Sequence, residues 1–151
     1  MKQFIIIMIA AIGWMLSSCT HNNGNIGPWF GTWKLNAITI DGEIDNEYAD
    51  NDNLVWKFQS TVIEMQEILP MHVTADHFGT WTQTSDRTVE MNFTYHDGLN
   101  PDGYPYYTPP ASSHLPRGVF VMDILELTSS KMHLQYRAND GTIYTYYLKK
   151  W

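Results

Sequence analysis

Few residues in this chain have the types and spacing that catalysis or metal binding requires. The sequence has no Gly-x-Ser-x-Gly nucleophile motif, no glycine-rich phosphate loop and no His-Glu-x-x-His metal motif. His72 and His77 are five residues apart, an odd offset that puts them on opposite faces of a strand and prevents a shared metal ion. Segment 41–53 carries six acidic residues, which suit Ca²⁺, but it lacks the spacing of an EF-hand, so a solvated charged loop is the simpler interpretation. We therefore predict no enzyme, no metal and no cofactor.

The single thiol of the chain has a spacing that does suggest chemistry. Cys19 ends the string Leu16-Ser17-Ser18-Cys19, which follows an apolar run too short for the ~20 residues of a membrane-spanning helix. The string resembles a lipobox, in which small residues fit a signal peptidase and the thiol accepts a diacylglyceryl group. The resemblance implies that residues 1–18 are a lipoprotein signal peptide and that Cys19 is lipidated at the start of the mature chain. An ordinary secretory peptide with a chance cysteine is the alternative.

The residues that follow Cys19 indicate a protein of the cell envelope. Residues 19–28 are polar and rich in Gly and Asn, which is typical of a flexible tether. No aspartate directly follows Cys19, and this favours the outer membrane. A formal net charge of −7 argues against nucleic acid as a partner and against a second, electrostatic contact with anionic lipid. We expect a monomer that is held on the membrane by its lipid anchor.

Residues 29–151 are predicted to form one all-β domain. Short runs that alternate apolar and polar residues recur between turn residues, at 31–40, 54–60, 61–69, 72–84, 87–96, 117–127, 131–138 and 142–150. In the clearest run Val89, Met91, Phe93 and Tyr95 face one side of the strand. Eight sequential strands with mostly short connections predict an antiparallel up-and-down barrel, because closure removes the exposed edges of a flat sheet. A sandwich of two sheets is the alternative.

The connections between these runs are of two kinds. Asn139-Asp140-Gly141 predicts a tight hairpin between the last two strands, since Asp-Gly accepts the positive φ values of such turns. Two connections are long: 41–53, and 97–116 with its five prolines and three tyrosines. Loops of this length in a small domain are usually functional or disordered. Alternate connections of an up-and-down barrel emerge at the same end, so we expect both loops at one mouth.

The aromatic residues are the strongest indication of function. Strand parity gives one inward-facing set, which either lines an apolar ligand cavity or fills it: Trp33, Trp56, Phe58, Met65, Trp81, Met91, Phe93, Leu134, Tyr136, Tyr144 and Tyr146. Tyr104, Tyr106 and Tyr107 lie among the prolines of the second long loop and are predicted to form a lid or a recognition surface. Asp123 interrupts an apolar strand and either orients a polar ligand group inside the barrel or faces water.

Short motifs give the chain a resemblance to a known family. Gly31-Thr32-Trp33 opens the first strand, Asp41-Gly42 follows it, and Gly79-Thr80-Trp81 recurs later. Together they resemble the lipocalin-like lipoprotein domains common in Bacteroidetes, whose first-strand Trp packs across the base of an eight-stranded barrel. The resemblance implies a late basic residue that stacks on this Trp, which here is Arg137, Lys149 or Lys150.

Two functions from different classes follow from these observations. The first is a lipid-anchored carrier or sensor that holds a small apolar molecule inside the barrel. The second is a solid-barrel scaffold that recognises a protein or a glycan through its Tyr- and Pro-rich loop. The space left inside the barrel distinguishes them.

Overall fold

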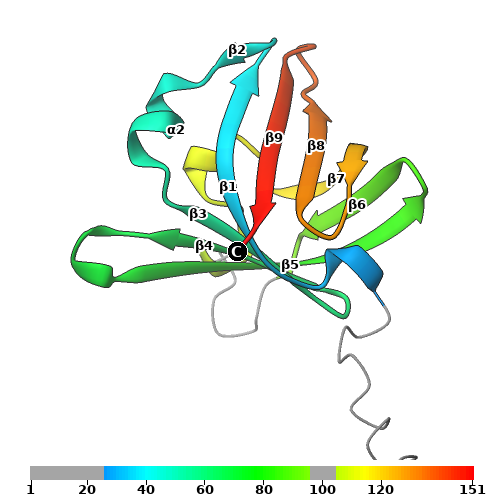
Figure 1. The fold of residues 1–151 in the computed structure, drawn as a ribbon, viewed down its shortest axis with the longest axis horizontal. Coiled ribbons are helices and arrows are strands. Elements are labelled where there is room, and N and C mark those ends of the chain that lie inside the picture. Colours follow the sequence, from blue (N-terminus) through cyan, green and yellow to red (C-terminus); the bar gives the residue numbers. More distant parts are fainter. Residues whose placement is uncertain (1–25, 96–104) are drawn as a thin grey trace, which may run out of the picture.

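The computed structural model describes residues 26–95 and 105–151, and these are mostly β-structure (Figure 1). The strands are β1 (Gly31–Ile40), β2 (Glu43–Ile44), β3 (Leu54–Gln59), β4 (Val62–Ile68), β5 (Thr74–Ser85), β6 (Thr88–Phe93), β7 (Gly118–Leu127), β8 (Lys131–Arg137) and β9 (Ile143–Lys150). The helical segments are α2 (Asn46–Asn51) and the short 3₁₀ turns η1 (Gly27–Trp29), η2 (Pro70–His72), η3 (Pro105–Tyr107) and η4 (Ala111–Ser113). Within the described ranges, no helix is long and apolar enough to cross a membrane.

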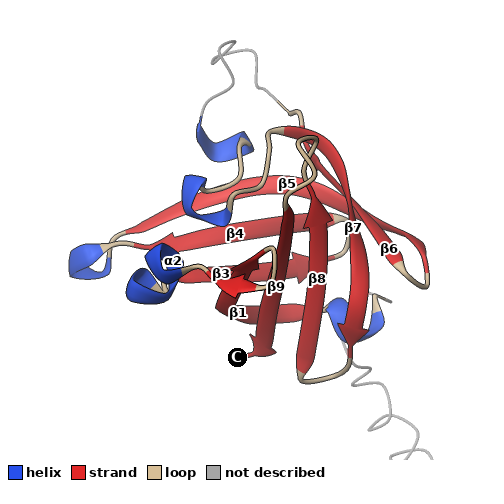
Figure 2. Ribbon diagram, turned by 90° about the horizontal axis from the view of Figure 1, so that it is seen from above, coloured by secondary structure: helices blue, strands red, loops and turns tan. Residues whose placement is uncertain are grey.

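The strands close into an eight-stranded antiparallel barrel, as the sequence predicts. Each strand from β3 to β8 pairs with the next one along the chain, and β1 pairs with both β3 and β9. The short β2 pairs only with the end of β1, through a turn in which Asp41 and Gly42 both have positive φ. Figure 2 shows the barrel from above, with β8 and β9 crossing the direction of β4 and β5. All eight predicted runs correspond to strands of the barrel.

Trp33 lies at the point where the sheet closes. Its backbone pairs with Trp56 on one side and with Lys150 on the other. The indole is fully buried and its Nε1 donates to the carbonyl oxygen of Trp29 at 2.9 Å. Lys150 places its Nζ 4.3 Å from the Trp33 ring centroid, a cation–π contact, and also donates to the Phe30 carbonyl. Lys150 is therefore the late basic residue at this tryptophan, and burial lowers its pKa.

The predicted alternation is confirmed along β6 but ends earlier than expected. Val89, Met91 and Phe93 are buried in the barrel, whereas Tyr95 lies beyond the end of the strand and is 61% exposed. Gly79 of β5 leaves room for the Phe93 ring, because a Cβ at this position would stand 2.9 Å from two of its carbon atoms. The close approach of strand and ring requires glycine here.

Several segments differ from the sequence-based expectations. The acidic 41–53 connection contains the six-residue helix α2, whose length is too short to produce a helical periodicity. His72 is not on a strand, because β5 starts at Thr74 and His72 lies in the hairpin tip before it. The ordered domain includes part of the expected tether, since Ile26 packs against the core and η1 begins at Gly27.

We predict that Trp33→Ala lowers the free energy of unfolding by about 3–5 kcal/mol, the usual cost of deleting a fully buried aromatic side chain. Trp151→Ala is the matched control, because Trp151 is 70% exposed. We expect it to change stability by no more than about 0.5 kcal/mol. Urea denaturation followed by circular dichroism measures both. Equal losses would mean that Trp33 does not hold the barrel closed.

Gly79→Ala is predicted to cost about 1–3 kcal/mol, the usual range for overpacking a filled core. The added methyl group would lie 2.9 Å from the backbone oxygen of Asn92 and from the Phe93 ring, so the β5–β6 pair must shift. Thr80→Ala, one residue along on the exposed face, serves as the control. If the Gly79→Ala protein has the same melting temperature as the wild type, Gly79 does not pack closely on Phe93.

Candidate functional site

The residues predicted to line the lumen form a continuous buried core. All but Tyr144 are buried and belong to one cluster: Trp33, Trp56, Phe58, Met65, Trp81, Met91, Phe93, Leu134, Tyr136 and Tyr146. Their rings contact one another closely, with centroid distances of 5.4 Å between Trp56 and Tyr146 and 5.3 Å between Phe58 and Trp81. Tyr144 is half-buried against this cluster. Of the two readings that the sequence left open, the arrangement matches the filled interior.

A role of this set in ligand binding stays a prediction. The buried Nε1 atoms of Trp56 and Trp81 have no hydrogen-bond acceptor among the described residues. An unpaired buried N–H group costs about 1–3 kcal/mol, so these two donors are the places where a small polar group inside the barrel would find a partner.

The mouth of the barrel is covered by residues from both long connections. Tyr48 of α2 and Leu115 both join the buried core. Tyr48 donates its hydroxyl to the Leu35 carbonyl at 2.5 Å, and Tyr146 donates to the Ser113 carbonyl at 2.8 Å. Burial raises the pKa of both phenols above the ordinary value of 10.0. The two hydroxyls therefore stay protonated donors that fix the cover to the barrel wall.

The two long connections also contact each other, which confirms that they flank one mouth. Asp45 caps α2 by accepting from the Glu47 and Tyr48 amides, and its other oxygen lies 2.7 Å from Nε2 of His114. Asp45 and His114 also line a hollow of about 310 Å³. Ser112 and Glu67 line the same hollow, and Ser112 donates to Glu67 at 3.1 Å. Within the described ranges, no three His, Cys, Asp or Glu side chains are arranged to hold a metal ion.

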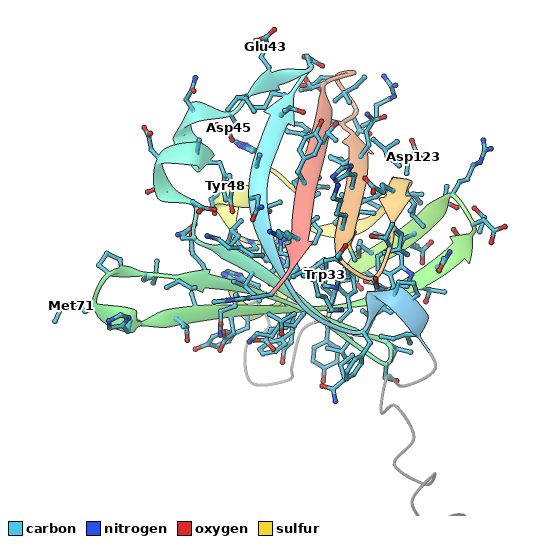
Figure 3. The ribbon with its side chains drawn as sticks, in the orientation of Figure 1. Trp33, Glu43, Asp45, Tyr48, Met71 and Asp123 are labelled. Carbon is cyan, nitrogen blue, oxygen red and sulfur yellow. The ribbon has the colours of Figure 1, made fainter. Side chains whose placement is uncertain are left out.

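The remaining predicted site residues lie apart from the lumen. Asp123 is exposed on the outer face of β7, so it faces water rather than a ligand inside the barrel (Figure 3). Cys19 and Tyr104 lie outside the described residues. Tyr106 is 51% exposed, and Tyr107 is partly buried. His77 contacts the second long connection, with Nδ1 2.6 Å from the Thr108 carbonyl, which gives it a structural role.

Tyr107 forms one wall of an apolar hollow on the outside of the barrel, which we call the external groove. It lies where β5 runs past the end of β6, and its volume is about 290 Å³. This is at the small end of the ~300–1,000 Å³ typical of small-molecule sites. It is lined by Val62, Phe78, Gly79, Thr80, Asn92, Thr94, Tyr95 and Tyr107. Val62, Thr80 and Asn92 are directly opposed on β4, β5 and β6, so their side chains share the outward face.

Both aromatic rings and polar side chains line this groove. Tyr95 and Tyr107 make an edge-to-face contact with centroids 4.8 Å apart. Phe78, which is partly buried, lines the same groove. Asn92 accepts two hydrogen bonds from Thr94, from its amide at 3.0 Å and its hydroxyl at 2.6 Å. The groove is not predictable from the sequence, because among its aromatic walls only Tyr107 lies in a segment expected to form a surface.

A second exposed apolar feature is the tip of the β4–β5 hairpin, which projects from the barrel (Figures 1 and 3). Met71 is 92% exposed, and Ile68 and Val73 are also exposed beside it. Met71 and His72 both have positive φ, at 62° and 60°. Two consecutive non-glycine residues in this region carry strain, and such strain is concentrated at functional sites.

Comparison with known proteins agrees with this architecture. The family described as the lipocalin-like domain matches residues 14–146. A lipocalin-like protein from Bacteroides uniformis superposes with a TM-score of 0.58 at 19% identity, covering 83% of this chain and 100% of that one. An uncharacterized protein from Bacteroides eggerthii gives 0.60 at 20% identity, covering 82% and 99%. None of the curated proteins compared with the chain matches it. The chain belongs to the lipocalin-like domain family.

Proposed function

We propose that this protein is a lipid-anchored binding protein of the cell envelope that holds a small, largely apolar molecule in the external groove. The observation that carries the proposal is the groove itself, in which three aromatic side chains border a hollow of about 290 Å³. A lipocalin-like barrel supports a ligand-binding role, and here the core side chains occupy the interior. An apolar ligand gains about 25 cal/mol for each Å² of surface that it buries, and the external groove offers that surface without unpacking the core.

An environment-sensitive naphthalene probe tests the proposal. Titration of the delipidated domain at micromolar concentration is expected to give saturable binding of one probe per protein. Tyr107→Ser removes one wall; losing on the order of 55 Å² of contact at ~25 cal/mol per Å² corresponds to a tenfold weaker affinity. Tyr106→Ser is the matched control, because Tyr106 is the adjacent tyrosine and does not line the groove. Unchanged affinity in Tyr107→Ser, or an absence of saturable binding, would overturn the proposal.

Attachment to the membrane is proposed to depend on Cys19, the only thiol of the chain. Two or more acyl chains on this residue would anchor the protein stably, since each buried methylene contributes about 0.8 kcal/mol. Cys19→Ser is expected to move the protein from the membrane fraction to the soluble fraction of the envelope. Ser18→Ala, which keeps a small residue before the thiol, is the control and should stay with the membrane. A Cys19→Ser protein that is still processed and remains in the membrane would contradict lipidation.

The second candidate function is a scaffold that binds a protein or a glycan. It is favoured by the exposure of Met71 at the hairpin tip and of Tyr106 in the loop. The same titration separates the two functions. A scaffold predicts no saturable probe binding, and loss of a partner interaction when Met71 or Tyr106 is replaced by Ser.

A further inference from the structure

We infer that the ligand of the external groove is an uncharged ring-shaped molecule with a hydrogen-bond acceptor, and that Asn92 donates to this acceptor. The inference rests on the proposed function and specifies the chemistry of the molecule bound. It follows from three features of the groove: an unpaired amide donor, a lining whose described residues are all uncharged, and walls that are aromatic.

The donor is the side-chain amide of Asn92. Its oxygen is occupied by the amide and the hydroxyl of Thr94, at 3.0 and 2.6 Å. Within the part of the chain that the structure describes, no acceptor pairs with its Nδ2. The backbone N–H of Thr94 can only donate, so its bond fixes which end of the Asn92 amide is the oxygen. The NH₂ group is therefore the end left for a partner in the groove. A carbonyl, ether or hydroxyl oxygen on the ligand is the complementary group.

The described lining of the groove offers no partner to a charged ligand group. Every described lining residue is uncharged, so a buried ligand charge would lose water without gaining a counterion from them. The charged side chains of the described residues lie around the groove. Glu64 is opposite Phe78 on the outer face but is paired with Lys57 at 2.6 Å, and Glu90 lies two residues before Asn92. Arg117 is exposed just before β7, next to the residue that pairs with the last residue of β6, and is therefore the cation to test against an anionic ligand.

The walls favour a flat ring over a flexible chain. Tyr95 and Tyr107 meet edge to face at an interplanar angle of 71°, which keeps their rings at a fixed angle beside Phe78. A volume of about 290 Å³ accepts a molecule of one or two rings. A rigid ring also loses little conformational entropy on binding, whereas an acyl chain would have to immobilise each of its bonds.

A set of matched naphthalenes tests the inference: 2-acetylnaphthalene with a neutral acceptor, unsubstituted naphthalene with none, 2-naphthoate as an anion and 2-naphthylmethylammonium as a cation. We expect the acetyl compound to bind about fivefold to tenfold more tightly than naphthalene, the gain of one net hydrogen bond, and both ions to bind more weakly than naphthalene.

Asn92→Asp is the decisive variant, because it keeps the oxygen that Thr94 uses and replaces the NH₂ donor by an acceptor of the same shape. The advantage of the acetyl compound over naphthalene should disappear. Asn139→Asp makes the same change of charge at an exposed turn and should leave that advantage intact. Arg117→Gln should alter no affinity in the series.

The outcomes separate the inference from the proposed function. If no member of the series binds, the external groove is not a binding site and both fail. If naphthalene binds but the acetyl group adds nothing, or the advantage survives in Asn92→Asp, the groove binds ligand without Asn92 and only the inference fails. Preferred binding of 2-naphthoate that is lost in Arg117→Gln would replace the neutral ligand by an anionic one.

Discussion

The pairing of β1 with β9 is the contact on which the rest of the structure depends. It runs from Trp33 opposite Lys150 to Ile40 opposite Tyr144, with one irregularity after Leu35. Without it the sheet would have two long unpaired edges, which native proteins avoid because such edges pair with other chains. Trp33 stabilises this seam from inside, where its indole lies between the Trp29 carbonyl and the Lys150 ammonium group. The same tryptophan therefore joins the first strand, the last strand and the η1 turn that precedes the barrel.

A closed barrel of eight strands has an interior that is just wide enough to be filled by side chains. In this chain large aromatic residues fill it, and Tyr48, Ser113 and Leu115 from the two long connections cover its mouth. The cover is fixed by buried phenol hydroxyls and by the contact between Asp45 and His114. Free apolar surface is consequently found on the outside, where β5 extends past β6 and the η3 turn lies beside it. For this reason the binding position that we propose is the external groove and not the lumen.

Much of the fold could be predicted because it depends on local alternation. The buried and exposed positions of β6 and β8 follow directly from the order of apolar and polar residues. The turn at Gly141 could be predicted for the same reason, since positive φ is a local requirement. The helix α2 was missed because six residues stabilised by the Asp45 cap carry no periodic signal.

The candidate site was less predictable because it depends on register and on contacts between distant segments. The alternation of residues along each strand identifies which side chains point into the barrel. It does not tell whether those side chains leave space between them. The alignment of Val62, Thr80 and Asn92 is a property of strand register, and the contact of Tyr95 with Tyr107 crosses a loop. The contact between Asp45 and His114 joins residues 69 positions apart. The sequence alone does not favour any of these contacts over other pairings of the same residues.

Mapping of ligand-induced NMR shifts distinguishes binding outside the barrel from binding in its lumen. With 2-acetylnaphthalene added to the isotope-labelled domain, we expect shift changes centred on the Asn92 side-chain amide, Thr80 and Tyr107. The indole N–H of Trp56 and the methyl groups of Leu134, both inside the barrel, should not move. Large changes at Trp56 and Leu134, with none at Asn92, would show that the ligand enters the lumen and does not bind in the external groove.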